Sequence, residues 1–136
     1  MTPSSGSGTN QIFTFLFSDA NGATDLHQEY ILINQTQAGD HACMTVLDGA
    51  NLYLLNDTGT VWLGPITLGS SSTLENSQCT LSGAGSSTTL SGTNLTVRLL
   101  LTFKPAFTGT KTIYALANDR AGLDTGMLAL GTWIIQ

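Results

Sequence analysis

Three alternating phenylalanines constrain the fold of this chain more than any other feature. Phe13, Phe15 and Phe17 are spaced two residues apart. Side chains at this spacing share one face of a β-strand, whereas they cannot share one face of a helix. The segment 11–17 is therefore predicted to be a strand that buries its aromatic face in a core.

The longest alternating run, residues 94–103, predicts a second core strand. Its inward residues are Leu95, Val97, Leu99, Leu101 and Phe103, and its outward residues are Thr96, Arg98 and Thr102. Further strands are expected at 29–34, 43–47, 52–55, 60–63, 111–117 and 130–135. A turn at 56–59 makes 52–55 and 60–63 a hairpin, which Gly64 and Pro65 should end. The Ser/Thr/Gly-rich stretch 69–92 predicts a loose region with one short strand-like piece around Cys79.

These strands predict an all-β chain, since no segment has the pattern of an amphipathic helix. We expect an antiparallel, immunoglobulin-like β-sandwich of about seven to nine strands. Its domain should span 11–136. Residues 1–10 read as a Ser/Gly-rich linker that serves either as an edge strand or as a contact with a neighbouring subunit.

Charge excludes some partners. Only 10% of residues are charged, the net charge is −5, and the four basic residues are Arg98, Lys104, Lys111 and Arg120. Nucleic acid requires a clustered basic surface, so neither nucleic acid nor an anionic membrane surface is an expected partner. The longest apolar run has the length of a strand, so no membrane insertion is expected.

The two cysteines, Cys43 and Cys79, favour a disulfide. Neither has a Cys or His partner at the spacing of a metal site, because His41 stands alone beside Cys43. A disulfide implies an oxidising, extracellular or cell-surface location. The alternative, two buried reduced thiols, would fit a cytosolic protein.

Two segments resemble immunoglobulin-like or fibronectin III-like repeat modules of large secreted and surface proteins of bacteria. Residues 13–33 are similar to a B strand, a turn at Asp19 to Gly22, and a C strand. Residues 112–123 are similar to an F strand and its following loop, and 131–135 to a closing G strand. The resemblance covers the first and last forty residues. It implies a spacer, an adhesive unit or a carbohydrate-associated accessory domain, with an A strand that is either within 2–8 or missing.

Acidic residues follow two of the expected strands. In the resemblance these loops meet at one pole, and Asp19, Asn21, Asp25, Asp119 and Asp124 would supply oxygen ligands for Ca²⁺. The alternative is ordinary turn chemistry, in which Asp and Asn side chains bond their own backbone.

The hairpin carries a second candidate site. Trp62 and Tyr53 lie on its two arms, with Asn56 and Asp57 in its turn and Asn51 nearby. Aromatic faces beside amides and carboxylates are typical of sugar-binding surfaces, although packing on the sheet is the alternative. Trp133 and Tyr114 have apolar neighbours in sequence and are expected in the core.

Catalysis is not expected. The two histidines, His27 and His41, lie in no nucleophile or zinc motif, and the chain contains no Gly-x-Ser-x-Gly sequence. Asp19 and Asp119 could approach as a carboxylate pair, but loops on a small sandwich offer no deep cleft. We therefore expect a structural and interaction module that contacts sibling modules or copies of itself. The alternative is a carbohydrate-binding module that holds polysaccharide at Trp62 and Tyr53.

Overall fold

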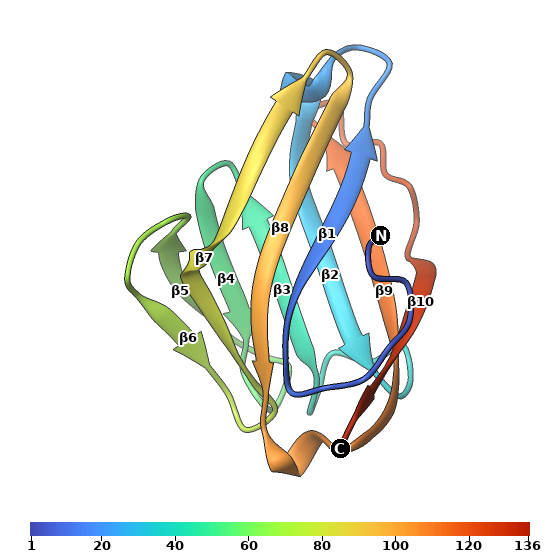
Figure 1. Cartoon of the computed structure of the whole chain (residues 1–136). Coiled ribbons are helices and arrows are strands. Elements are labelled where there is room, and N and C mark those ends of the chain that lie inside the picture. Colours follow the sequence, from blue (N-terminus) through green and yellow to red (C-terminus); the bar gives the residue numbers. More distant parts are fainter.

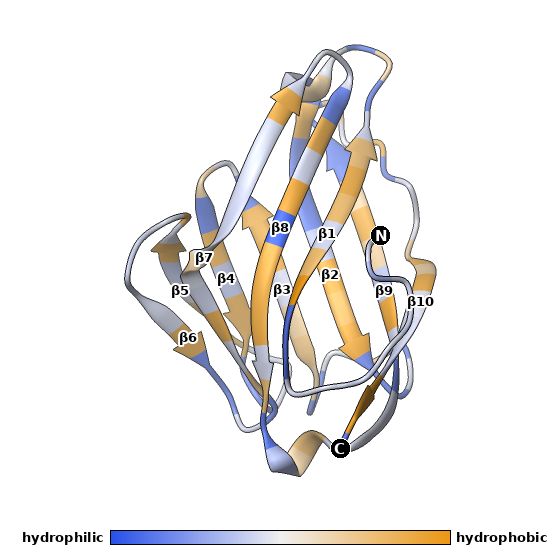
Figure 2. Cartoon of the chain, viewed as in Figure 1, coloured by the Kyte–Doolittle hydropathy of each residue, from blue (hydrophilic) through white to orange (hydrophobic).

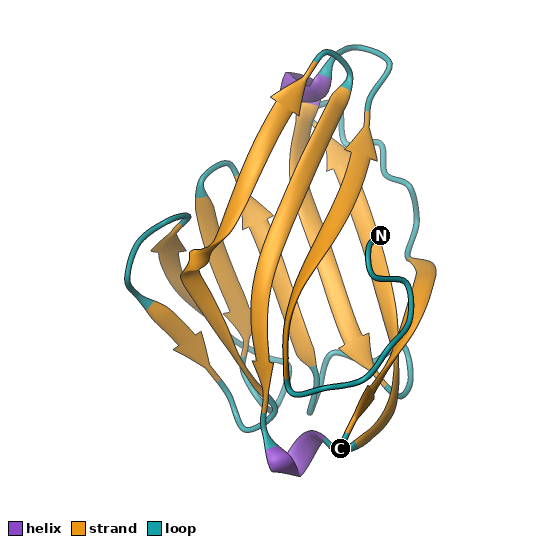
Figure 3. Ribbon diagram, viewed as in Figure 1, coloured by secondary structure: helices purple, strands orange, loops and turns teal.

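Two antiparallel sheets pack face to face in the computed structural model, which describes all residues 1–136 (Figures 1 and 3). One sheet has four strands in the order β1-β8-β7-β6, and the other has six in the order β10-β9-β2-β3-β4-β5. The strands are β1 (Asn10–Ser18), β2 (Leu26–Asn34), β3 (Cys43–Asp48), β4 (Asn51–Leu55), β5 (Trp62–Thr67), β6 (Thr73–Glu75), β7 (Cys79–Ser91), β8 (Asn94–Phe103), β9 (Gly109–Asp119) and β10 (Leu128–Ile135). Helical turns are limited to η1 (Ala23–Asp25) and η2 (Pro105–Phe107). The predicted β-sandwich is confirmed, with ten strands rather than seven to nine.

The predicted inward residues form the core. Phe13 and Phe15 on β1 are fully buried, and Phe17 packs against the core from a partly buried position. All five inward residues predicted for β8 are buried. β1 pairs with β8 along its whole length, so the two alternating runs present their apolar sides to the same interior. This match arises because a one-residue slip in register would move each apolar set to the solvent side.

The predicted disulfide is present and joins the two sheets. Cys43 begins β3 in the six-stranded sheet, and Cys79 begins β7 in the four-stranded sheet. Their sulfurs are bonded, their Cα atoms are 5.8 Å apart, and both residues are fully buried. The bond indicates that the chain folds in an oxidising environment.

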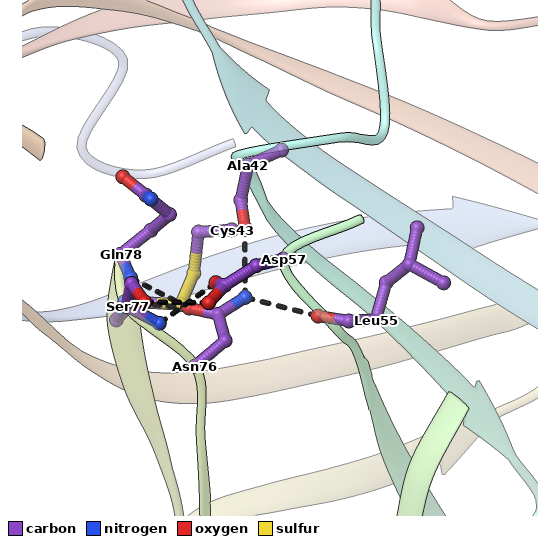
Figure 4. The surroundings of a disulfide bond; sticks show 8 residues. Ala42, Cys43, Leu55, Asp57, Asn76, Ser77 and Gln78 are labelled. Carbon is purple, nitrogen blue, oxygen red and sulfur yellow. Dashed lines mark hydrogen bonds between the residues drawn. A yellow bond between two sulfur atoms is a disulfide. The ribbon is translucent and has the colours of Figure 1, made fainter. Parts of the chain in front are cut away.

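A buried amide organises the backbone around the disulfide (Figure 4). The Asn76 Nδ2 group donates to the carbonyl oxygens of Ala42 and Leu55, both at 2.9 Å. Its Oδ1 atom accepts the backbone N–H groups of Gln78 and Cys79, at 2.8 and 2.9 Å. One side chain therefore satisfies four polar backbone groups and connects the two sheets beside the covalent link.

The N-terminal segment, residues 1–9, closes the side of the sandwich between β1 and β10 (Figure 1). Thr2 exchanges two backbone hydrogen bonds with Thr14 of β1, each 2.8 Å. Farther along, the Gly8 N–H donates to Ile134 of β10, and the indole N–H of the buried Trp133 donates to the Gly8 carbonyl. The segment thus lies along both sheets of its own chain, with isolated bridges in place of a continuous A strand.

The Ser/Thr/Gly-rich stretch contains more strand than its sequence predicted. Instead of one short piece around Cys79, it forms β6 and the 13-residue β7. Figure 2 shows β7 as pale for much of its length, in contrast to the orange bands of β1 and β8. Gly85 explains part of this composition, because a Cβ atom there would collide with the Leu100 side chain of β8.

The predicted hairpin is confirmed, but its end is not. β4 and β5 pair antiparallel around the 56–59 turn, and β5 continues through Gly64 and Pro65 to Thr67. The pairing register of β4 with β5 shifts between Leu52 and Leu54. Gly64 and Pro65 therefore lie where this ladder is disrupted. Proline is tolerated there because β5 is an edge strand and its neighbour needs no N–H at the disrupted position.

Candidate functional site

All three tyrosines lie on the outer face of the six-stranded sheet. In β2 and β4, Tyr30 and Tyr53 alternate with buried core residues, so their side chains point away from the interior. Tyr30 lies opposite Val46 on β3, which in turn lies opposite Tyr53. Tyr114 occupies an outward position on β9, between the core residues Ile113 and Ala115. The prediction that Tyr114 is a core residue is wrong, because its apolar neighbours in sequence face the opposite side.

Trp62 joins this surface from the edge strand β5. Its ring lies 6.2 Å from the Tyr30 ring, and 37% of the residue is exposed. Trp62 and the three tyrosines are called the aromatic face below. The sequence predicted Trp62 and Tyr53 as part of a site but not Tyr30 and Tyr114. Tyr30 could have been found, because it alternates with Ile31 and Ile33 and so faces away from the core. Trp133, in contrast, is buried in the core as predicted.

The polar residues expected beside Trp62 have structural partners. The Asn56 Oδ1 atom accepts the N–H groups of Thr60 and Val61, which closes the β4–β5 turn. Both carboxylate oxygens of Asp57 accept hydrogen bonds from Ser77, one from its backbone N–H and one from its hydroxyl. These bonds are the main reason that the Asp57 pKa is lowered. Asn56 and Asp57 therefore hold loops together.

Three of the five acidic-loop residues come together at the opposite end of the sheet from Cys43. Carboxylate oxygens of Asp19, Asp25 and Asp119 all lie within 4.8 Å of one another. Asp124 lines the same shallow hollow, of about 170 Å³, beside Asp19 and Asp119. The predicted meeting of the two loops is present, and its donor atoms are the hard oxygens that Ca²⁺ prefers.

The same carboxylates also perform turn chemistry. Asp19 accepts the N–H of Asn21, and Asp119 accepts the N–H groups of Ala121 and Leu123. Asp124 likewise accepts the N–H of Gly126. Both interpretations of the acidic residues therefore have a geometric basis.

Crowding of carboxylates leaves an electrostatic signature at Asp25. Its pKa is raised, first by desolvation, then by a side-chain hydrogen bond with Asp19 and by the charges of Asp19 and Asp119. A hydrogen bond from Asn21 acts in the opposite direction and lowers it. The charges of Asp19 and Asp119 therefore add to desolvation in favouring the protonated form of Asp25.

A buried carboxyl, Glu29, is the main polar feature that sequence analysis missed. It shares the inward parity of Ile31 and Ile33 on β2, and only 2% of it is exposed. Burial, and secondarily the charge of Asp48, raises its pKa to about 7. The sequence contained a signal for this burial, because Glu29 is two residues before Ile31 and so falls on the apolar side of the predicted strand 29–34.

The histidines lie apart from these features. His27 Nε2 is 3.9 Å from a carboxylate oxygen of Asp48, and His41 Nδ1 is 3.5 Å from Asp40. Both histidines form these contacts from partly or largely exposed positions. Neither contacts a serine or cysteine in a nucleophile–base arrangement.

No family model, curated protein or solved structure matches the chain. None of its helical segments has the length and apolar character needed to cross a membrane.

Proposed function

We propose that the chain is a non-catalytic structural and interaction module of a secreted or cell-surface protein, in which it acts as a spacer or self-associating unit. The observation that carries this proposal is the double closure of the sandwich. The disulfide joins β3 to β7, and residues 1–9 join β1 to β10. Such links stabilise a small domain against local opening, which is the step that exposes a chain to proteases.

Limited proteolysis tests the spacer role. The oxidised chain should resist a broad-specificity protease, and reduction should expose the β6–β7 region to cleavage, because the disulfide is its covalent tie to the six-stranded sheet. Equal cleavage rates with and without reductant would contradict the proposal. Leu16→Ala is the control. Leu16 is exposed on β1, at the opposite edge of the four-stranded sheet from β6, and this variant should be cleaved as the unmodified chain is.

Self-association is tested through the N-terminal segment. If neighbouring copies exchange residues 1–9, light scattering should detect oligomers that increase with concentration and disappear when residues 1–9 are deleted. The exchanged segment would place the same Thr2–Thr14 and Gly8–Ile134 bonds between copies instead of within one. A monomer at all concentrations would leave the spacer role and remove self-association.

A second candidate function, carbohydrate binding, is favoured by the aromatic face. Sugar rings pack on aromatic rings through their apolar C–H faces, and three tyrosines with one tryptophan form one outward surface. Polysaccharide pull-down and a glycan array test it. Binding should weaken in Trp62→Ala and Tyr30→Ala, whereas Leu16→Ala on the opposite sheet should retain it. Failure of every glycan to bind would favour the spacer.

A further inference from the structure

A cavity of about 320 Å³ lies between the two sheets at the end of the sandwich that contains η1. Both sheets contribute to its wall. Half of its lining residues are apolar, including Leu26, Leu47, Leu90 and Leu95. Its volume lies at the small end of the range of about 300–1,000 Å³ that is typical of ligand sites. A ligand of this cavity would therefore be a small molecule with an apolar body.

Glu29 supplies the polar group in this cavity. Its side chain lines the cavity wall, and its position on β2 points it between the sheets instead of toward solvent. Residue 29 lies opposite Leu47 on β3 and Ala117 on β9, both of which are buried. The carboxyl group is thus surrounded by apolar side chains on the neighbouring strands.

No protein group compensates the Glu29 carboxylate. The two factors that act on it, burial and the charge of Asp48, both oppose ionisation, and no hydrogen bond acts in the other direction. Arg120 and His27 also line the cavity wall, but neither forms a hydrogen bond or an ion pair with Glu29. Arg120 Nε donates to the Thr24 carbonyl oxygen, and His27 lies beside Asp48. A buried ionisable group without a partner is costly, and a ligand that supplies the partner would remove that cost.

We propose that the Glu29 cavity binds a small apolar amine, with the ammonium group against the Glu29 carboxylate and the hydrocarbon part among the leucines. A primary or secondary ammonium fits because it donates charge-assisted hydrogen bonds to a carboxylate that lacks any donor. An anionic group placed against Glu29 would meet the like charges of Glu29 and Asp48. A divalent metal would find one carboxylate where six or more oxygens are needed.

Nuclear magnetic resonance titration of the full chain with benzylamine and benzyl alcohol at about pH 8 tests this proposal. The two probes share an aromatic body and differ in the cationic group. Benzylamine should bind with a dissociation constant on the order of millimolar and shift the resonances of Glu29, Leu47 and Leu95. Benzyl alcohol should bind at least roughly tenfold more weakly, because it cannot form the ion pair.

Three variants separate the carboxylate from the cavity. Glu29→Gln keeps the shape and should weaken benzylamine binding roughly tenfold or more while leaving benzyl alcohol unaffected. Glu75→Gln makes the same chemical change at the other glutamate of the chain, which is exposed, and should change neither. Ala50→Leu, at an exposed position in the cavity wall, should weaken both probes.

Equal binding of the two probes, full retention of benzylamine binding by Glu29→Gln, or benzylamine shifts confined to the aromatic face would each overturn the proposal. The aromatic face and the cavity are read out by different resonances, so failure here leaves the proposed spacer or carbohydrate function intact.

Discussion

Replacement of Glu29 by Gln is expected to make the protein more stable at neutral and alkaline pH. The wild-type carboxyl is inside the sandwich and has no hydrogen-bonding partner there. At high pH it must be either ionised in an apolar environment or protonated against the solution pH. Glutamine has nearly the same shape as the protonated acid and never ionises, so the substitution removes this penalty alone.

The magnitude follows from the pKa values of the two states. The Glu29 pKa is about 7 in the folded chain, against a reference value of 4.5. Because the folded state holds the proton more tightly, the free energy of unfolding falls as pH rises from about 4.5 to about 7. A difference of about 2.5 pKa units corresponds to about 3 kcal/mol. The variant should therefore match the wild type near pH 4 and exceed it by up to about 3 kcal/mol near pH 8.

Urea denaturation, followed by the fluorescence of the two tryptophans, of which Trp133 is buried, measures this difference across the pH range. Other titrating groups are common to both proteins and cancel when the two curves are subtracted. Glu75→Gln is the matched control. Its carboxylate pairs with Lys104 at 3.1 Å from a largely exposed position, so its difference curve should be nearly flat. A flat curve for Glu29→Gln as well would refute the reasoning, because it would show an ordinary solvated carboxyl.

Three other variants test the links between the sheets and one unpartnered polar group in the core. Replacing both Cys43 and Cys79 by Ala should lower the free energy of unfolding by about 4 kcal/mol, the chain-entropy value for a loop of this length, as urea denaturation would show. Asn76→Ala should cost about 3 kcal/mol or more, because it leaves four backbone groups without their partner; a loss below about 1 kcal/mol would contradict that role. Thr45→Val should be neutral or stabilising by about 1 kcal/mol in thermal unfolding, because the buried Thr45 hydroxyl has no hydrogen-bond partner.

Alternation in the sequence was sufficient to predict the core strands. In β1 and β8 every second residue is large and apolar, so the pattern determined both the strand and its buried face. β7 could not be predicted in this way because its strand character depends on its neighbours. Gly85 packs under Leu100, and Cys79 is fixed by the disulfide and by Asn76. Contacts with distant residues decide such a strand, and its own composition indicates a loop.

The sites show the same division between local and distant information. The meeting of Asp19 and Asp119 was expected from the resemblance to immunoglobulin-like modules, in which both loops lie at one pole. The partner of Asp57 was not predictable, since Ser77 lies 20 positions away on a segment that had been expected to be irregular. Tyr114 shows the limit of reading apolar neighbours without parity: Ile113 and Ala115 face the core, and for that reason the residue between them does not.

Lys111 and Glu29 are two buried ionisable side chains that differ in whether the chain provides a partner for their charge. Both are ionisable residues at inward positions, and burial shifts both pKa values toward the neutral form. Lys111, which is 7% exposed, places its Nζ atom 4.2 Å from the centre of the Phe107 ring, so a cation–π contact offsets part of its desolvation. Glu29 has no such compensation within the chain. A fold that provides a partner for one buried charge and leaves the other facing a cavity retains an unfavourable term, and binding of a cation at Glu29 would turn that term into ligand affinity.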